Sequence, residues 1–144
     1  MKHSKIDIIV LAKSLVGKAL WKSKPELCEQ PSYFDCSTLI NWLYMQIGIL
    51  IPVGPYQQFE YCCVYGQEIK LEHIEIGDFV FITSPWVGKI RVNPQAKFGH
   101  VGIVSEYSKI ICATNSELGK GVIEIGFDKL FATRSFCGAG RIIS

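Results

Sequence analysis

The feature that most limits how this chain can fold is a change in the spacing of its apolar residues, from helical in the first part to strand-like in the second. In residues 6–16 and 36–47, apolar side chains recur every three or four positions, which is the spacing of an amphipathic helix. From residue 78 onward they form short runs rich in Val, Ile and Phe, separated by Gly, Asn, Ser or Pro, as in β-strands. Helices followed by strands, without strict alternation, predict an α+β domain in which a helical layer packs on a mainly antiparallel sheet.

Individual elements follow from these patterns and from the breaks between them. Gly17 and Gly48 are natural C-terminal stops for the first two helices. Residues 18–33 have the character of an irregular connector with a short helical turn, and Trp21 within it is expected to pack in the core. The helices are expected over residues 6–16, 36–47 and 56–65, and the strands over residues 78–83, 101–104, 109–113, 122–125 and 136–143.

Length and composition bound the number of domains and the classes of partner. The chain has 144 residues and is 49% hydrophobic, which suffices for one core, so a single domain over residues 1–144 is expected. Lys and Arg number 15 against 13 Asp and Glu, without a long run of one sign, which argues against nucleic acid as a partner. No apolar run reaches the roughly 18 to 20 residues of a membrane span, and nothing in the sequence indicates an oligomeric state.

The N-terminus and the cysteines bear on the cellular compartment. The apolar stretch near the start is interrupted by Asp7 and Lys13 and has no clear cleavage site for a signal peptide. The chain is therefore expected to be cytoplasmic, unless it is exported by another route. In the reducing cytosol its six cysteines are expected to be free thiols, and none of them has the C-x-x-C spacing of metal or redox motifs.

Cys36 is the cysteine best placed for chemistry, because it begins the predicted second helix. Unpaired N–H groups at a helix start favour the thiolate, which is the nucleophilic form of cysteine, and Asp35 is suited to be the N-cap. The backbone N–H of Cys36 is also available to bind an oxyanion. The alternative is that Cys36 packs in the core as a small apolar residue, which is common for free cysteines.

His100 is the base that such a nucleophile needs. It begins a predicted strand and is flanked by Gly99 and Gly102, which leave space around the imidazole and let a neighbouring segment approach closely. An imidazole accepts a proton near neutral pH and returns it to a leaving amine, although a hydrogen-bonded structural histidine is the alternative. The loop over residues 84–98, which carries Trp86 and three basic residues, is expected to form one wall of a cleft.

Five short motifs surround these two residues in a fixed order. They are Phe34-Asp35-Cys36-Ser37, Gly48-Ile49, Pro52 followed by Gln57-Gln58, Ile76-Gly77-Asp78-Phe79-Val80-Phe81, and Gly99-His100-Val101-Gly102-Ile103. In this order they resemble the NlpC-type cell-wall peptidases, whose catalytic domain has a compact papain-like fold. The resemblance runs over most of the chain and implies that Cys36 is the nucleophile and His100 its base.

The same resemblance brings Cys112 to the position of the family's third polar residue, usually His, Asn or Gln. That residue orients the imidazole through a hydrogen bond, for which a thiol is a weak partner. Asn115 is chemically better suited, but on a regular strand it points away from Cys112, so its use requires a bulge, and a bound water is another alternative. Val53 is a second departure, because the family commonly has Arg after the proline, and the loss of that charge bears on the substrate.

These residues together predict a cysteine peptidase or amidohydrolase that needs no cofactor or metal. By the resemblance, its substrate is a peptide or peptidoglycan fragment cut near a D-γ-glutamyl bond, with Tyr33, Asp35 and Ser37 holding the free amino end. Two alternatives stay open. One is an amidase or acyltransferase that uses the same pair on a non-wall substrate, and the other is a peptide-binding module with weakened catalysis.

Overall fold

Three helices form the first half of the structure, a computed structural model that describes residues 5–84 and 97–143. They are α1 (Lys5–Leu15), α2 (Cys36–Met45) and α3 (Pro55–Tyr65), close to the three predicted ranges. Gly17 and Gly48 lie just beyond α1 and α2 with φ angles of 75° and 78°, a left-handed conformation that glycine adopts without strain. The chain therefore leaves both helices where the sequence predicts.

The segment between α1 and α2 contains two very short strands. β1 (Leu20–Trp21) pairs in parallel with β2 (Tyr33–Phe34), and the 3₁₀ helix η1 (Leu27–Glu29) between them is the predicted helical turn. Phe34 at the end of β2 is fully buried, and the next residue, Asp35, caps α2. This short pairing fixes how the chain enters the helix that carries Cys36.

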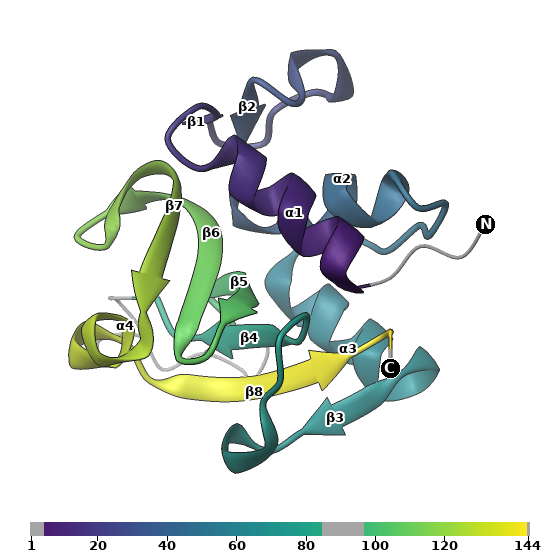
Figure 1. Ribbon diagram of the computed structural model, residues 1–144, viewed down its shortest axis with the longest axis vertical. Coiled ribbons are helices and arrows are strands. Elements are labelled where there is room, and N and C mark those ends of the chain that lie inside the picture. The colour runs from purple at the N-terminus through teal and green to yellow at the C-terminus, as the bar shows by residue number, and fades with distance from the viewer. Residues whose placement is uncertain (1–4, 85–96, 144) are drawn as a thin grey trace.

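Six strands form one antiparallel sheet (Figure 1). Its order is β3-β8-β4-β5-β6-β7, and every neighbouring pair is antiparallel, which confirms the predicted α+β class. A second 3₁₀ helix, η2, follows β3, and α4 connects β7 to β8. The elements are β3 (Gln67–Ile69), η2 (Leu71–His73), β4 (Phe79–Ile82), β5 (His100–Glu106), β6 (Lys109–Ser116), β7 (Gly119–Gly126), α4 (Phe127–Thr133) and β8 (Phe136–Arg141).

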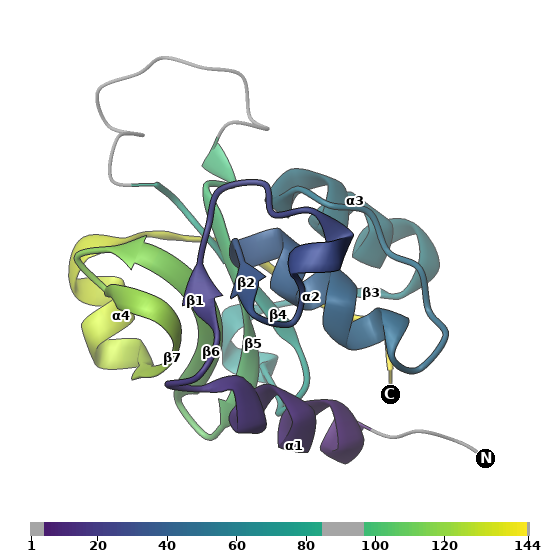
Figure 2. The same ribbon diagram turned by 90° about the horizontal axis from the view of Figure 1, so that it is seen from above.

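Both faces of the central strands are buried, but beneath different helices. Figure 2 shows α1, α2 and α3 on one side of the sheet and α4 on the other. On the first side Phe79 and Val101 belong to the apolar cluster that includes α1 and α2, and on the second side Val80 and Ile110 pack with Leu130 of α4. Strands β4, β5 and β6 are thus held between two close-packed layers, which makes them a rigid base for side chains at their ends.

Five short elements of the structure have no counterpart in the prediction: β1, β2, β3, η2 and α4. Helix α4 has seven residues, too few to display a helical hydrophobic period, and β3 is a three-residue strand with a mostly exposed pattern. Both lie away from the motifs that carry the chemistry. Within the described parts of the chain, no helix combines the length and apolar character that crossing a membrane requires.

Candidate active site

A reciprocal cap fixes the start of α2 around Cys36. The Asp35 carboxylate accepts hydrogen bonds from the backbone N–H of Thr38 at 2.9 Å and of Lys24 at 3.0 Å. In return, the Asp35 N–H donates to Thr38 Oγ1 at 2.9 Å. Asp35 is thus the predicted N-cap, and Cys36 is the first residue of the helix. This confirms that the sulfur lies at the positive end of α2.

Gln58 of α3 anchors the backbone next to Cys36. Its side-chain amide donates to the Ser37 carbonyl at 2.8 Å and to the Pro52 carbonyl at 2.9 Å, and the residue is buried. A buried amide bound to two carbonyl groups resists displacement, because leaving either group unpaired would cost free energy. The motif that contains Gln58 therefore ties α3, and the segment before it, to the start of the nucleophile helix.

Cys36 and His100 both line one cavity with a volume of about 610 Å³, within the range of small-ligand sites. The cavity lies between the start of α2, the start of β5 and the end of β6. Within residues 5–84 and 97–143 no hydrogen bond joins the two side chains, and such catalytic contacts often tighten only when substrate binds. The lining residues are Trp21, Asp35, Cys36, Ser37, Pro55, Ser84, Phe98, Gly99, His100, Ala113, Thr114, Asn115, Ser116, Glu117 and Arg134.

His100 is the first residue of β5 and is held in a tight setting. A Cβ atom at Gly99 would lie 2.4 Å from the backbone nitrogen of Ser84, and one at Gly102 would lie 3.1 Å from the Ile111 carbonyl oxygen. The two glycines thus permit the close approach that the sequence predicts. The imidazole is only 6% exposed, and its Nε2 atom is buried without a hydrogen-bond partner among the described residues.

The start of a helix is expected to lower the pKa of the Cys36 thiol, but the structure shows the opposite shift. Burial, and then the charge of Asp35, raise the pKa of the thiol to about 11. The backbone N–H groups of Val101, Ser37 and Cys36 itself act in the opposite direction and lower this pKa. Because burial outweighs the helix start, the thiol is neutral at pH 7 in the free protein.

The ionisation of His100 is shifted by burial as well. Burial, and then the charge of Arg134, lower the pKa of the imidazole to about 4, against a smaller effect of Glu117 that raises it. His100 is therefore an uncharged base at pH 7. The site holds a neutral thiol and a neutral imidazole, so a thiolate forms only as the proton moves to His100.

Cys112 lies on the same face of the sheet as His100 but is fully buried and does not line the cavity. In the described part of the chain neither Cys112 nor Asn115 forms a hydrogen bond with His100. The pairing of β6 with β7 is regular through Asn115, so no bulge turns its exposed side chain toward the face of Cys112. Thr114, two residues after Cys112 on that face, does line the cavity.

Two of the three residues expected to hold substrate, Asp35 and Ser37, line the cavity. Tyr33 is not a lining residue and is 36% exposed beside Lys22, whose Nζ lies 5.9 Å from the ring centre. The prediction that Trp21 packs in the core is wrong. Because β1 is a two-residue strand exposed along its length, Trp21 is 37% exposed, and it lines the cavity instead.

Other predicted features lie beside the cavity or outside the described residues. Val53 is half exposed and does not line the cavity. Trp86 and most of the basic loop lie in residues 85–96, which the structure does not describe. All six cysteines are free thiols. Among the described residues, no group of three or more His, Cys, Asp or Glu side chains is arranged to hold a metal ion.

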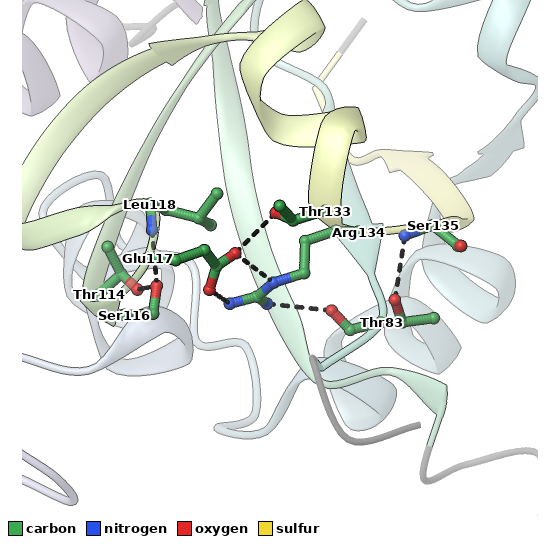
Figure 3. Close-up of polar contacts among 8 residues, drawn as sticks. All are labelled: Thr83, Thr114, Ser116, Glu117, Leu118, Thr133, Arg134 and Ser135. Carbon is green, nitrogen blue, oxygen red and sulfur yellow. Dashed lines mark hydrogen bonds and ion pairs between the residues drawn. The ribbon is translucent and has the colours of Figure 1, made fainter. Parts of the chain in front are cut away.

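Arg134 and Glu117 form an ion pair at the cavity wall that sequence reasoning missed (Figure 3). Arg134 Nε and Nη2 donate to the two carboxylate oxygens of Glu117 at 3.0 and 2.9 Å, and Nη1 donates to the Thr83 carbonyl at 3.0 Å. The hydrogen bond from Arg134 is the main reason that the pKa of Glu117 is lowered to about 2. One residue lies in a turn and the other follows a short helix, so no sequence spacing relates them.

The profile of the NlpC/P60 family matches residues 27–129, which include the start of α2 and the whole of β5 and β6. No curated protein matches the sequence significantly.

Solved structures with the same fold come from bacteria and from a protozoan. NlpC2 from Trichomonas vaginalis has a TM-score of 0.76 at 20% identity, over 100% of this chain and 48% of that one. The peptidoglycan hydrolase RipB from Mycobacterium tuberculosis has a TM-score of 0.67 at 18% identity, over 97% of this chain and 65% of that one. The NlpC/p60 domain of the peptidoglycan hydrolase SagA has a TM-score of 0.70 at 21% identity, over 96% of this chain and 99% of that one. The present chain thus spans about half the length of the Trichomonas vaginalis protein.

Proposed function

The chain belongs to the NlpC/P60 family, and from that membership we propose that it is a cysteine peptidase or amidohydrolase acting on peptidoglycan stem peptides. The observation that carries the proposal is the placement of Cys36, at the start of α2, and of buried His100 on the walls of one cavity. A helix start offers backbone N–H groups for a developing oxyanion, and a neutral imidazole is ready to take the thiol proton.

The chemistry proceeds through an acyl-enzyme. The Cys36 sulfur attacks the amide carbonyl carbon while its proton passes to His100. This step forms a tetrahedral intermediate with the negative charge on the former carbonyl oxygen. The C–N bond then breaks, and His100 returns the proton to the leaving amine. Water attacks the thioester with His100 again as the base, which releases the carboxylic acid and restores the thiol. Because the free thiol is neutral, proton transfer to His100 and attack are coupled.

The finer proposal is that the scissile bond follows a D-γ-glutamyl residue. It is supported by the family and by the relatives RipB and SagA, whose names describe them as peptidoglycan hydrolases. Asp35 and Ser37 line the cavity beside Cys36, where a carboxylate and a hydroxyl are suited to a peptide amino group. Both oxygens of Asp35 already accept backbone N–H groups, so an ammonium group would share them.

A panel of purified muropeptides tests the proposal. The wild type is expected to cut stem peptides at the D-γ-glutamyl bond, with products identified by mass spectrometry, and Cys36→Ala is expected to be inactive. Cys63→Ala, which removes an exposed thiol outside the cavity, is the matched control and should cleave at the wild-type rate. No cleavage of any muropeptide by the wild type would exclude the wall-peptidase function.

One observation favours a second candidate, a peptide-binding module with weakened catalysis. The Nε2 atom of His100 has no partner among the described residues, and Cys112 offers only a thiol nearby. An imidazole that is not oriented by a hydrogen bond is a poorer base. Muropeptide binding without turnover, unchanged in Cys36→Ala, would support this candidate over the hydrolase.

A further inference from the structure

The wall of the cavity on the His100 side carries a guanidinium group that is not fully used. Arg134 has five N–H donors, and three of them bind Glu117 and the Thr83 carbonyl. The remaining two, one on Nη1 and one on Nη2, have no partner among the described residues. Figure 3 shows the guanidinium between the Glu117 carboxylate and Thr83, and both members of the ion pair line the cavity.

A second donor lies on the same wall. Thr114 Oγ1 and Ser116 Oγ are 2.8 Å apart, and the backbone N–H of Leu118 donates to Ser116 at 3.2 Å. Only one of the two hydroxyl protons can lie between the two oxygens. The other has no acceptor within the described ranges, so it is free for a ligand in the cavity that Thr114 and Ser116 both line.

The Arg134–Glu117 ion pair has no net charge, but its two charges contribute unequally to the electrostatic potential in the cavity. The side chain of Arg134 is 4% exposed and that of Glu117 is 38% exposed, so water screens the carboxylate more than the guanidinium. The shift at His100 agrees with this difference, because Arg134 lowers the pKa of the imidazole more than Glu117 raises it. The interior on this side therefore has a positive potential, whereas Asp35 adds a negative charge to the lining of the same cavity.

A purely structural role does not account for this arrangement. The connection between the end of β4 and the end of α4 is also made by the backbone N–H of Ser135, which donates to Thr83 Oγ1 at 3.0 Å. Thr133 Oγ1 separately binds Glu117 at 2.7 Å. If Arg134 only connected these two segments, it would need neither two unused N–H groups nor a position on the cavity wall.

We propose that Arg134, with the free hydroxyl proton of the Thr114–Ser116 pair, binds a carboxylate of the substrate on the His100 side of the cavity. The preferred substrate is then an acidic peptide that spans from Asp35 to Arg134. The guanidinium is always charged and has five N–H donors, so the unused N–H groups on Nη1 and Nη2 can donate to a second carboxylate while Nε and Nη2 bind Glu117. This inference names the substrate class of the proposed active site and rests on that proposal.

Binding to Cys36→Ala tests the inference without turnover. The probes are the peptide L-Ala-γ-D-Glu-L-Lys and two versions of it, one amidated at the glutamyl α-carboxylate and one at the C-terminus, measured by calorimetry. One of the two amidations is expected to weaken binding about tenfold, because it removes a charge-assisted contact. With Arg134→Gln added, that difference should disappear. An amidation effect that is absent, or of equal size with and without Arg134, would overturn the inference.

Glu117→Gln is a second test that does not depend on whether Arg134→Gln folds correctly. This variant removes the neutralising charge and keeps Arg134, so binding of the acidic peptide should become several-fold tighter, a gain that misfolding cannot produce. Weaker or unchanged binding would contradict a carboxylate site. Thr133→Ala, which removes a Glu117 contact without touching Arg134, is the matched control and should preserve the tenfold preference.

Wild-type turnover of the same three peptides separates this inference from the proposed function. Absence of cleavage together with Arg134-dependent discrimination in binding would reject the hydrolase and retain the carboxylate site. Cleavage of all three peptides with equal kcat/KM would retain the hydrolase and reject the carboxylate site.

Discussion

Gly102 of β5 lies against Cys112 of β6, and a Cβ atom at Gly102 would lie 3.3 Å from the Cβ of Cys112. Because side chains alternate along a strand, Cys112 is thereby on the same face as His100, with only a glycine between them along that face. A polar side chain at 112 could reach over the glycine toward the imidazole. The thiol makes no such bond, and the His100 Nε2 atom is left without a partner among the described residues.

Cys112→Asn is therefore expected to raise kcat. An amide oxygen at this position can accept the Nε2 proton and hold the ring in the orientation that faces Cys36. A gain of about tenfold is expected, since misplacing a catalytic group by 1 Å can cost about 100-fold. The buried amide should lower the free energy of unfolding by about 1–3 kcal/mol, which urea denaturation would measure.

The matched control for this gain is Cys62→Asn, which places the same amide at another fully buried thiol outside the cavity. It should lose stability without any rise in kcat. If Cys112→Asn folds and its kcat does not exceed that of the wild type, position 112 is not where His100 is oriented.

The activity of the wild type is expected to extend to acidic pH. The pKa of His100 is lowered to about 4, so the imidazole stays a neutral base well below its ordinary pKa of 6.5. The acidic limb of kcat/KM, which reports the free enzyme, should lie closer to pH 4 than to pH 6.5. Since the folded state binds fewer protons than the unfolded chain, stability should also fall as the pH drops below 6.5.

The two charges at the cavity wall should move this limb in opposite directions. Arg134→Gln removes the cation that lowers the pKa of His100, so the acidic limb should move to higher pH. Glu117→Gln removes the opposing anion and should move it to lower pH. A rate profile over pH on one substrate checks both, and movement in the same direction in both variants would contradict the electrostatic cause.

The parts of the fold that local sequence predicts are those with local causes. The start of α2 follows from Asp35 as N-cap, and the helix ends follow from Gly17 and Gly48, whose positive φ angles the chain needs at those points. The strands of the sheet are predicted from short apolar runs rich in Val, Ile and Phe, and this prediction does not depend on how individual side chains pack. These features are set within a few residues, so one sequence is sufficient to find them.

The features that sequence reasoning missed depend on contacts between distant segments. Arg134 meets Glu117 only because the turn after β6 and the end of α4 come together in the fold. The pKa of Cys36 rises because tertiary packing buries a helix start that, by itself, would lower it. The exposure of Trp21 also depends on a contact between separate segments, because β1 pairs in parallel with β2 and does not pack in the core.

Asp35→Asn is expected to make Cys36 more reactive toward iodoacetamide. Asn is as good an N-cap as Asp, so α2 should still begin at Cys36, while the charge that helps to raise the pKa of the thiol is gone. The midpoint of alkylation against pH should lie near 11 in the wild type and lower in the variant. Site-resolved mass spectrometry is required, because Cys28 and Cys63 are exposed.

Thr38→Val is the control for this experiment. It breaks the other half of the cap, in which the Asp35 N–H donates to Thr38 Oγ1, and changes no charge. The alkylation midpoint should then stay near that of the wild type. A wild-type midpoint at or below pH 8.5 would show instead that the helix start, and not burial, controls the thiol.

The strongest effect on stability is expected at Asp78, the fully buried partner of Arg141. Arg141 Nε and Nη2 donate to its two oxygens at 2.7 and 2.9 Å, and the Glu75 N–H donates to the same carboxylate at 2.8 Å. Asp78→Ala leaves the guanidinium without its buried partner, so the free energy of unfolding should fall by about 3–5 kcal/mol. Glu75→Gln, at an exposed carboxylate 2.6 Å from the same guanidinium, should cost less than about 1 kcal/mol. Urea denaturation of both variants gives the comparison, and equal losses would mean that burial of the pair does not decide its contribution.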